Sequence, residues 1–126
     1  MQKAVLPFLL LVSSTLAQTY QLQDLSLGSV PGASSACLDA INANVGCPTE
    51  IGWLYGNPYQ DLGKSTLQSL CTESCRSSLQ AHRKAIANAC TAGVEYIDVI
   101  ERTTYLPTAL DDQIIFAYNA ACLKKS

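Results

Sequence analysis

The sequence is 126 residues long and carries eight lysines and arginines against ten aspartates and glutamates, so its formal net charge is −2. The basic pair Lys124 and Lys125 is too short to form the basic face that a nucleic acid or an anionic membrane would need. Beyond the first residues, no stretch approaches the roughly 20 apolar residues of a membrane-spanning helix. We therefore expect a protein that binds neither nucleic acid nor membrane.

Residues 1–17, MQKAVLPFLLLVSSTLA, have the layout of a secretory signal peptide. Lys3 gives a basic start, an apolar run follows, and the small residues Thr15 and Ala17 precede the expected cleavage point. The alternative, a buried N-terminal helix, does not explain why these three regions occur in this order. Cleavage would remove Lys3 and leave one secreted, extracellular domain with a net charge of −3.

Residues 18–34 are polar and interrupted by glycine, serine and proline, which indicates a flexible lead-in. The lead-in contains Leu22, Leu25 and Leu27, which offer a way to dock on the domain. We place a cysteine-rich helical domain at residues 35–126.

The domain is expected to begin with a helix capped by Ser34 or Ser35, because serine accepts hydrogen bonds from the first helical amides. This helix should end at Gly46, since glycine readily takes the left-handed conformation after a helix. Its inward face would carry Cys37, Leu38, Ile41 and Val45.

Residues 48–64 combine turn-forming residues with three aromatic residues, Trp53, Tyr55 and Tyr59. Aromatic rings stack on the apolar faces of sugars, so these three residues form a candidate ligand surface. We favour the alternative in which Trp53 fills the core and the tyrosines cover it, because such rings bury a large apolar area.

Residues 66–90 predict one continuous helix, because apolar residues and cysteines recur every three or four positions. Cys71 and Cys75 should then point the same way. His82 is expected to be a half-buried packing residue, and Arg76, Arg83 and Lys84 are expected to be solvated. The predicted stripe is Leu67, Leu70, Cys71, Ser74, Cys75, Ser78, Leu79, His82, Ile86 and Cys90.

Residues 91–106 fit neither helical nor strand spacing cleanly. We slightly favour a short helix with Ile97 and Ile100 inward, because a single strand would have no partner.

A last helix is predicted to begin near Pro107, with Asp111 and Asp112 at its positive end and Lys124 and Lys125 at its negative end. Its apolar stripe is Leu110, Ile114, Ala117, Tyr118, Ala121 and Cys122. With the two preceding helices, it predicts an all-α fold: a small disulfide-stapled bundle of about three helices.

An even number of cysteines in a small secreted chain predicts a disulfide framework. A zinc site has less support, because the closest pair, Cys71 and Cys75, lacks the usual spacing and His82 is the only imidazole. We expect no metal and no cofactor. The six cysteines are Cys37, Cys47, Cys71, Cys75, Cys90 and Cys122.

Sequence alone does not choose among the many possible pairings of six cysteines. Our preferred arrangement pairs the outer and then the inner cysteines of antiparallel neighbouring helices, and ties the central helix to the last one. It consists of Cys37–Cys75, Cys47–Cys71 and Cys90–Cys122.

The sequence offers little catalytic chemistry. His82 lies in a predicted helix with no adjacent nucleophile motif, and the helix dipole already explains Asp111 and Asp112. The other carboxylates form no pair that the sequence alone supports, and phosphate-binding glycine motifs are absent. We therefore expect a protein that is not an enzyme, with a small hydrolase as the least supported alternative.

Three motifs together resemble a known family: LCTESCRSSL at 70–79, YLP at 105–107 and YNAACLK at 118–124. They are similar to the cysteine-rich region that precedes or separates lysin-motif (LysM) domains in secreted fungal LysM proteins. The resemblance covers about residues 35–124, including the order and spacing of all six cysteines. We find no LysM motif within the sequence, so no chitin-contacting residue of the family can be assigned to a position here.

The resemblance implies an extracellular fungal protein connected with chitin, because LysM proteins bind N-acetylglucosamine oligomers and some act as effectors. Our leading hypothesis is a secreted, non-enzymatic helical module associated with chitin or cell-wall polysaccharide, through a LysM segment that this sequence lacks. The alternative is a free-standing secreted effector or inhibitor that binds another protein through the surface of Trp53, Tyr55 and Tyr59.

Overall fold

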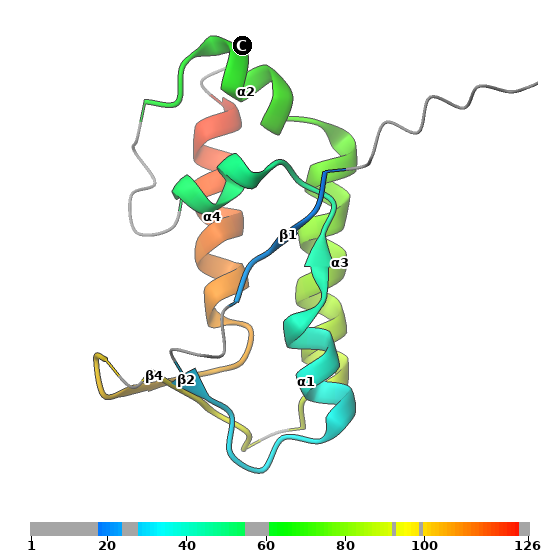
Figure 1. Ribbon diagram of the computed structural model, residues 1–126, viewed down its shortest axis with the longest axis vertical. Coiled ribbons are helices and arrows are strands. Elements are labelled where there is room, and N and C mark those ends of the chain that lie inside the picture. Colours follow the sequence, from blue (N-terminus) through cyan, green and yellow to red (C-terminus); the bar gives the residue numbers. More distant parts are fainter. Residues whose placement is uncertain (1–17, 24–27, 55–60, 92, 99, 124–126) are drawn as a thin grey trace, which may run out of the picture.

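The computed structural model describes residues 18–23, 28–54, 61–91, 93–98 and 100–123. Two long helices, α3 (Glu73–Ala89) and α4 (Ala109–Leu123), lie side by side, and α1 (Ser35–Asn42) packs against α3 (Figure 1). The short helix α2 (Lys64–Leu70) and the 3-10 helix η2 (Thr49–Leu54) contact each other, and η2 also contacts α4. The predicted helical, disulfide-stapled class is confirmed, with two small sheets added to it.

The start of α1 is as the sequence predicts, because Ser34 Oγ accepts a hydrogen bond of 3.1 Å from the backbone N–H of Cys37. The predicted end at Gly46 is wrong. The backbone turns extended at Ala43, and Val45 belongs to the strand β3 (Asn44–Val45). Val45 is still fully buried, so its apolar character reflects core packing and not helix membership.

Parts of the lead-in, residues 18–34, pair with later segments of the chain. Strand β1 (Tyr20–Gln21) pairs antiparallel with β3, and β2 (Gly28–Ser29) pairs antiparallel with β4 (Tyr96–Asp98). Leu22 is buried and docks on the core as the sequence suggested, whereas Leu25 and Leu27 lie outside the described residues. Strands of two residues are too short to show a period of two in the sequence.

The predicted continuous helix over residues 66–90 is interrupted between α2 and α3. Helix α2 ends at Leu70, and Thr72 begins a new helix by accepting a 3.1 Å hydrogen bond from the backbone N–H of Cys75. The hydroxyl of Tyr118, in α4, lies 3.0 Å from the carbonyl oxygen of Leu70 and 3.1 Å from that of Thr72. It therefore adds a side-chain hydrogen bond at the interruption to carbonyls that also accept backbone N–H groups, Leu70 from Thr72 and Thr72 from Arg76.

The slight preference for a helix within residues 91–106 is wrong. Strand β4 pairs antiparallel with β5 (Thr103–Tyr105), with Tyr96 opposite Tyr105, and β2 completes a three-stranded sheet in the order β2-β4-β5. The argument that a strand would lack a partner fails, because the partners come from the lead-in and from the hairpin itself.

All six cysteines are disulfide-bonded, but none of the three preferred pairings is correct. The bonds are Cys37–Cys90, Cys47–Cys75 and Cys71–Cys122. The prediction placed Cys71 and Cys75 on one face of a single helix, and the interruption at residues 71–72 removes that constraint. Cys71 is therefore able to bond to α4, while α1 packs along α3 and Cys37 reaches Cys90 beyond the end of that helix.

The core consists of two clusters. The larger one joins α2, α3, α4, η2 and β3, and contains Leu22, Val45, Cys47, Ile51, Leu54, Leu62, Leu70, Cys75, Leu79, Ile114, Ala117, Tyr118 and Ala121. The smaller one joins α1 to the second half of α3 and the segment after it, and contains Val30, Cys37, Ile41, Ile86 and Val94. One disulfide is thus embedded in each cluster, and Cys71–Cys122 ties the end of α2 to the end of α4.

Helix α4 confirms the prediction from Pro107, and the predicted apolar stripe packs as expected at Ile114, Ala117, Tyr118 and Ala121. The pair Lys124 and Lys125 lies outside the described residues. Asp111 differs from the prediction, because it is fully buried on the same face as the apolar residues. A buried carboxylate needs a partner. One partner of Asp111 is Gln23, which also lines the candidate site.

Candidate functional site

The aromatic surface expected at residues 53–59 is described only at Trp53. Its side chain is 53% exposed, so the favoured packing of Trp53 in the core is wrong. Ile51 and Leu54 fill the core instead, because residues three apart share one side of a 3-10 helix and Trp53 falls off that side. Tyr55 and Tyr59 lie outside the described residues, so the ligand role of this surface stays a prediction.

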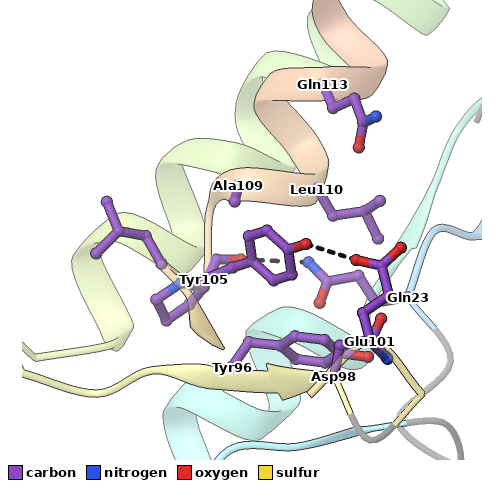
Figure 2. A pocket seen from close by; sticks show the side chains of 10 residues that line it. Gln23, Tyr96, Asp98, Glu101, Tyr105, Ala109, Leu110 and Gln113 are labelled. Carbon is purple, nitrogen blue, oxygen red and sulfur yellow. Dashed lines mark hydrogen bonds between the residues drawn. The ribbon is translucent and has the colours of Figure 1, made fainter. Parts of the chain in front are cut away.

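A pocket of about 350 Å³ opens elsewhere, between the β4–β5 hairpin and the start of α4. Figure 2 shows the hairpin supplying Tyr96, Asp98, Glu101 and Tyr105, with Leu110 and Gln113 of α4 above them. The described lining is Gln23, Tyr96, Asp98, Glu101, Tyr105, Leu106, Pro107, Ala109, Leu110 and Gln113. It combines two phenol rings, two carboxylates and two amides on an apolar base.

The hairpin turn fixes the first carboxylate. Asp98 Oδ1 accepts hydrogen bonds of 2.8 Å from the backbone N–H of Ile100 and 2.9 Å from that of Glu101. Arg102 closes the turn in the left-handed conformation, with a φ of 56°, and its N–H donates to the carbonyl oxygen of Asp98 at 2.9 Å. An aspartate side chain that binds the backbone of its own turn is a usual way to hold such a conformation.

The second carboxylate is held by a tyrosine across the hairpin. The hydroxyl of Tyr105 donates to Glu101 Oε2 at 2.7 Å (Figure 2). It also accepts a hydrogen bond from Thr103 Oγ1 at 3.1 Å. The bond from Thr103 lowers the pKa of Tyr105, but the bond to Glu101 and the nearby negative charge outweigh it, so the pKa is raised. Tyr105 therefore remains a hydrogen-bond donor to the carboxylate.

The back of the pocket rests on a buried polar chain. Gln23 is only 3% exposed, and its Nε2 donates at 3.3 Å to both the carbonyl oxygen of Pro107 and Asp111 Oδ1. Asp111 Oδ2 pairs with Nδ1 of His82 on α3. The lead-in, α3 and α4 are thus connected through one carboxylate.

His82 is buried as a partner of Asp111 and does not line the pocket. Burial lowers the pKa of His82, but the hydrogen bond and the charge of Asp111, with the carbonyls of Ile41 and Ala43 adding to them, raise it overall. Those carbonyls act at longer range, since Nε2 has no hydrogen-bond partner in the described part of the chain. The expectation of a packing residue for His82 agrees with this position, although its burial is more complete than expected.

The residue pattern does not indicate this pocket, because the pocket's residues are brought together only by the hairpin. Asp98 and Glu101 form no carboxylate pair that the sequence alone supports, and Tyr96 and Tyr105 lie in the segment 91–106, whose spacing fits neither a helix nor a strand. The role of Asp111 could have been found, since it stands three and seven positions before Ile114 and Tyr118 on the buried face. A charged residue on an apolar stripe indicates a buried, paired carboxylate. The helix dipole alone does not explain the position of Asp111 on that stripe.

Within the described ranges, no three His, Cys, Asp or Glu side chains gather where they could hold a metal ion. No described helix is both long enough and apolar enough to cross a membrane.

Comparison with known proteins identifies a family. The model of the family described as "Secreted LysM effector N-terminal domain" matches residues 17–126. A protein of Gibberella moniliformis named "Non-secreted LysM effector LCP1" is 32% identical over 127 residues, which covers 94% of this chain and 17% of that protein. The chain thus spans about a sixth of the length of this relative. No solved structure matches the chain significantly.

The word "non-secreted" describes that relative, whereas the family as a whole is described as secreted. The expected resemblance to the cysteine-rich region of LysM proteins and the expected secreted localisation are both confirmed at the level of the family. The chain belongs to the N-terminal domain family of secreted LysM effectors.

Proposed function

We propose that this chain is a non-enzymatic, disulfide-stapled domain of a chitin- or cell-wall-associated fungal LysM effector. The observation that carries the proposal is the family match over residues 17–126, a range that includes all three disulfides. Chitin binding by LysM segments is a property of the wider family, and the domain is proposed to accompany such a segment.

The pocket supports a binding role over a catalytic one. Its described lining holds two carboxylates but neither a histidine nor a nucleophilic serine, threonine or cysteine. A hydrolytic site of the serine or cysteine type needs a nucleophile beside a base, and His82 is instead enclosed with Asp111.

Sedimentation of the oxidised protein with insoluble chitin tests the proposal, with cellulose and xylan as controls. Selective retention on chitin would support a cell-wall role for this domain itself. Retention on all three polymers, or turnover of chitin oligomers, would contradict a specific non-enzymatic domain. Absence of retention would remove chitin binding from this domain and leave it as an accompaniment to LysM segments.

A second candidate, binding to another protein, rests on the exposure of Trp53. Exposed tryptophan is enriched where protein interfaces concentrate their binding energy. If a purified partner is found, Trp53→Ala should weaken its binding strongly. Unchanged affinity of that variant would remove this surface from consideration.

A further inference from the structure

The pocket presents negative charge and no positive charge. Asp98 and Glu101 line it, and its described lining contains no lysine, arginine or histidine. Arg102 follows Glu101 in the hairpin, but it does not line the pocket. A ligand that enters must therefore supply the positive charge or the hydrogen-bond donors that two carboxylates require.

Both carboxylates are oriented by the hairpin and still have acceptor capacity. The backbone donors bind Oδ1 of Asp98, and Tyr105 binds Oε2 of Glu101. A carboxylate offers about four acceptor positions, so Asp98 and Glu101 can accept further hydrogen bonds, including at Oδ2 and Oε1. Because the first oxygens are already fixed, the second ones can bind a ligand with little further loss of side-chain freedom.

The walls favour a ligand with a ring as well as a charge. Tyr96 and Tyr105 contribute phenol rings, which attract cations and pack against the apolar faces of saturated rings. Gln23 and Gln113 contribute amides, which can pair with hydroxyl groups. A cavity of about 350 Å³ has room for a small polyhydroxylated ring and not only for an ammonium head.

We infer that this pocket binds an amino sugar with a free, protonated amine, such as a glucosamine unit of deacetylated chitin. The ammonium group is held by Asp98 and Glu101, and the sugar ring lies against the tyrosines. The choice of an amino sugar over another amine rests on the proposed cell-wall association, whereas the ammonium site rests on the pocket itself.

The test is calorimetric titration of the oxidised protein with two tetramers of equal length, tetraglucosamine and its fully N-acetylated counterpart. Both titrations are run in the same mildly acidic buffer. Losing a charge-assisted hydrogen bond should weaken binding about ten- to a hundred-fold, so the acetylated tetramer should bind that much more weakly. Added salt should weaken binding of the charged tetramer alone.

Asp98→Asn and Glu101→Gln each remove a charge from the pocket and keep an oxygen that can accept the hairpin's hydrogen bonds. Each should weaken binding of tetraglucosamine about ten-fold or more, by the same reasoning. Asp39→Asn is the matched control, because Asp39 is exposed on α1 and does not line the pocket. It removes the same net charge and should leave binding unchanged.

Equal affinity for the two tetramers, no binding of either, or an equal effect of Asp39→Asn would overturn the ammonium site. Tighter binding of tetralysine than of tetraglucosamine would overturn the amino-sugar assignment. The comparison of the tetramers uses the unaltered protein, so it decides the matter even if a variant folds poorly. Retention on insoluble chitin with no binding of tetraglucosamine would leave the proposed function standing and remove this inference alone.

Discussion

At the scale of single residues, the buried pair of His82 and Asp111 affects the stability of the fold. Both side chains are buried, and each is the other's charged partner. A buried ion pair contributes little net stability compared with apolar packing, but removal of one partner leaves an uncompensated charge in the interior. The pair therefore makes the fold sensitive to substitution and to pH.

We expect Asp111→Asn to lower the free energy of unfolding by about 3–5 kcal/mol, as measured for broken buried pairs. Chemical unfolding followed by circular dichroism measures the loss. Asp112→Asn is the control, since Asp112 pairs with Arg83 at the surface and both side chains are about half exposed. An equal loss in the two variants would contradict the burial of this charge.

The pair also predicts the direction of pH dependence. Because the pKa of His82 is raised in the folded protein, its charged form stabilises the fold fully below the ordinary histidine pKa of about 6.5. This stabilisation is lost as the pH rises through the higher folded-state pKa. Unfolding measured from acid to alkaline pH should show the decrease in the wild type and a flatter profile in His82→Gln. A rise in stability over the same range would contradict the account.

At the scale of secondary-structure elements, the interruption between α2 and α3 decides how the chain is cross-linked. Thr72 caps α3, and Tyr118 supplies the hydroxyl that binds the carbonyls on both sides of the interruption. Burial raises the pKa of Tyr118, so the hydroxyl keeps the proton that it donates. The interruption is thus stabilised by the cap that Thr72 provides for α3 and by the hydroxyl of Tyr118 from α4.

Tyr118→Phe should lower the free energy of unfolding by about 1 kcal/mol, because the buried hydrogen bond of the hydroxyl to the carbonyls of Leu70 and Thr72 is lost. Tyr105→Phe removes the same atom from a side chain that is 40% exposed, and should change stability by no more than about 0.5 kcal/mol. Thermal or denaturant unfolding of both variants makes the comparison. If the two losses are the same, the hydroxyl of Tyr118 has no special role at the interruption.

The elements that the sequence predicted well are those with local signals. Ser34 marks the start of α1, and the aspartates of the first turn and the apolar stripe mark α4. The short strands were missed because their partners lie far away: β1 pairs with β3, and β2 with β4. Thr72 was an available capping signal, but the apolar stripe running through Cys71 and Cys75 concealed it.

At the scale of the whole molecule, the three disulfides cross-link a small core. Cys37–Cys90 and Cys47–Cys75 each belong to one of the two core clusters, and Cys71–Cys122 joins the end of α2 to the end of α4. The number of cysteines and the secreted class predicted that all six would be bonded, and spacing along one assumed helix gave the wrong partners. Pairing depends on how helices pack in three dimensions, which residue spacing alone did not encode. The pocket was unpredictable for the same reason, since its carboxylates and rings meet only after the hairpin forms.

Digestion of the oxidised protein and mass spectrometry of the linked peptides should recover Cys37–Cys90, Cys47–Cys75 and Cys71–Cys122. Removing any one bond by paired substitution with alanine should cost about 2–5 kcal/mol of stability. Recovery of the nested set Cys37–Cys75, Cys47–Cys71 and Cys90–Cys122 would instead mean that residues 66–90 form one helix.

We propose that this LysM effector domain binds a cell-wall amino sugar in the pocket between the hairpin and α4. The most direct measurement is co-sedimentation of the oxidised protein with chitin and with the same polymer after deacetylation, comparing wild type and Glu101→Gln. The account predicts retention that increases with deacetylation and is largely lost in Glu101→Gln. Equal retention of wild type and variant, or no retention on either polymer, would contradict it.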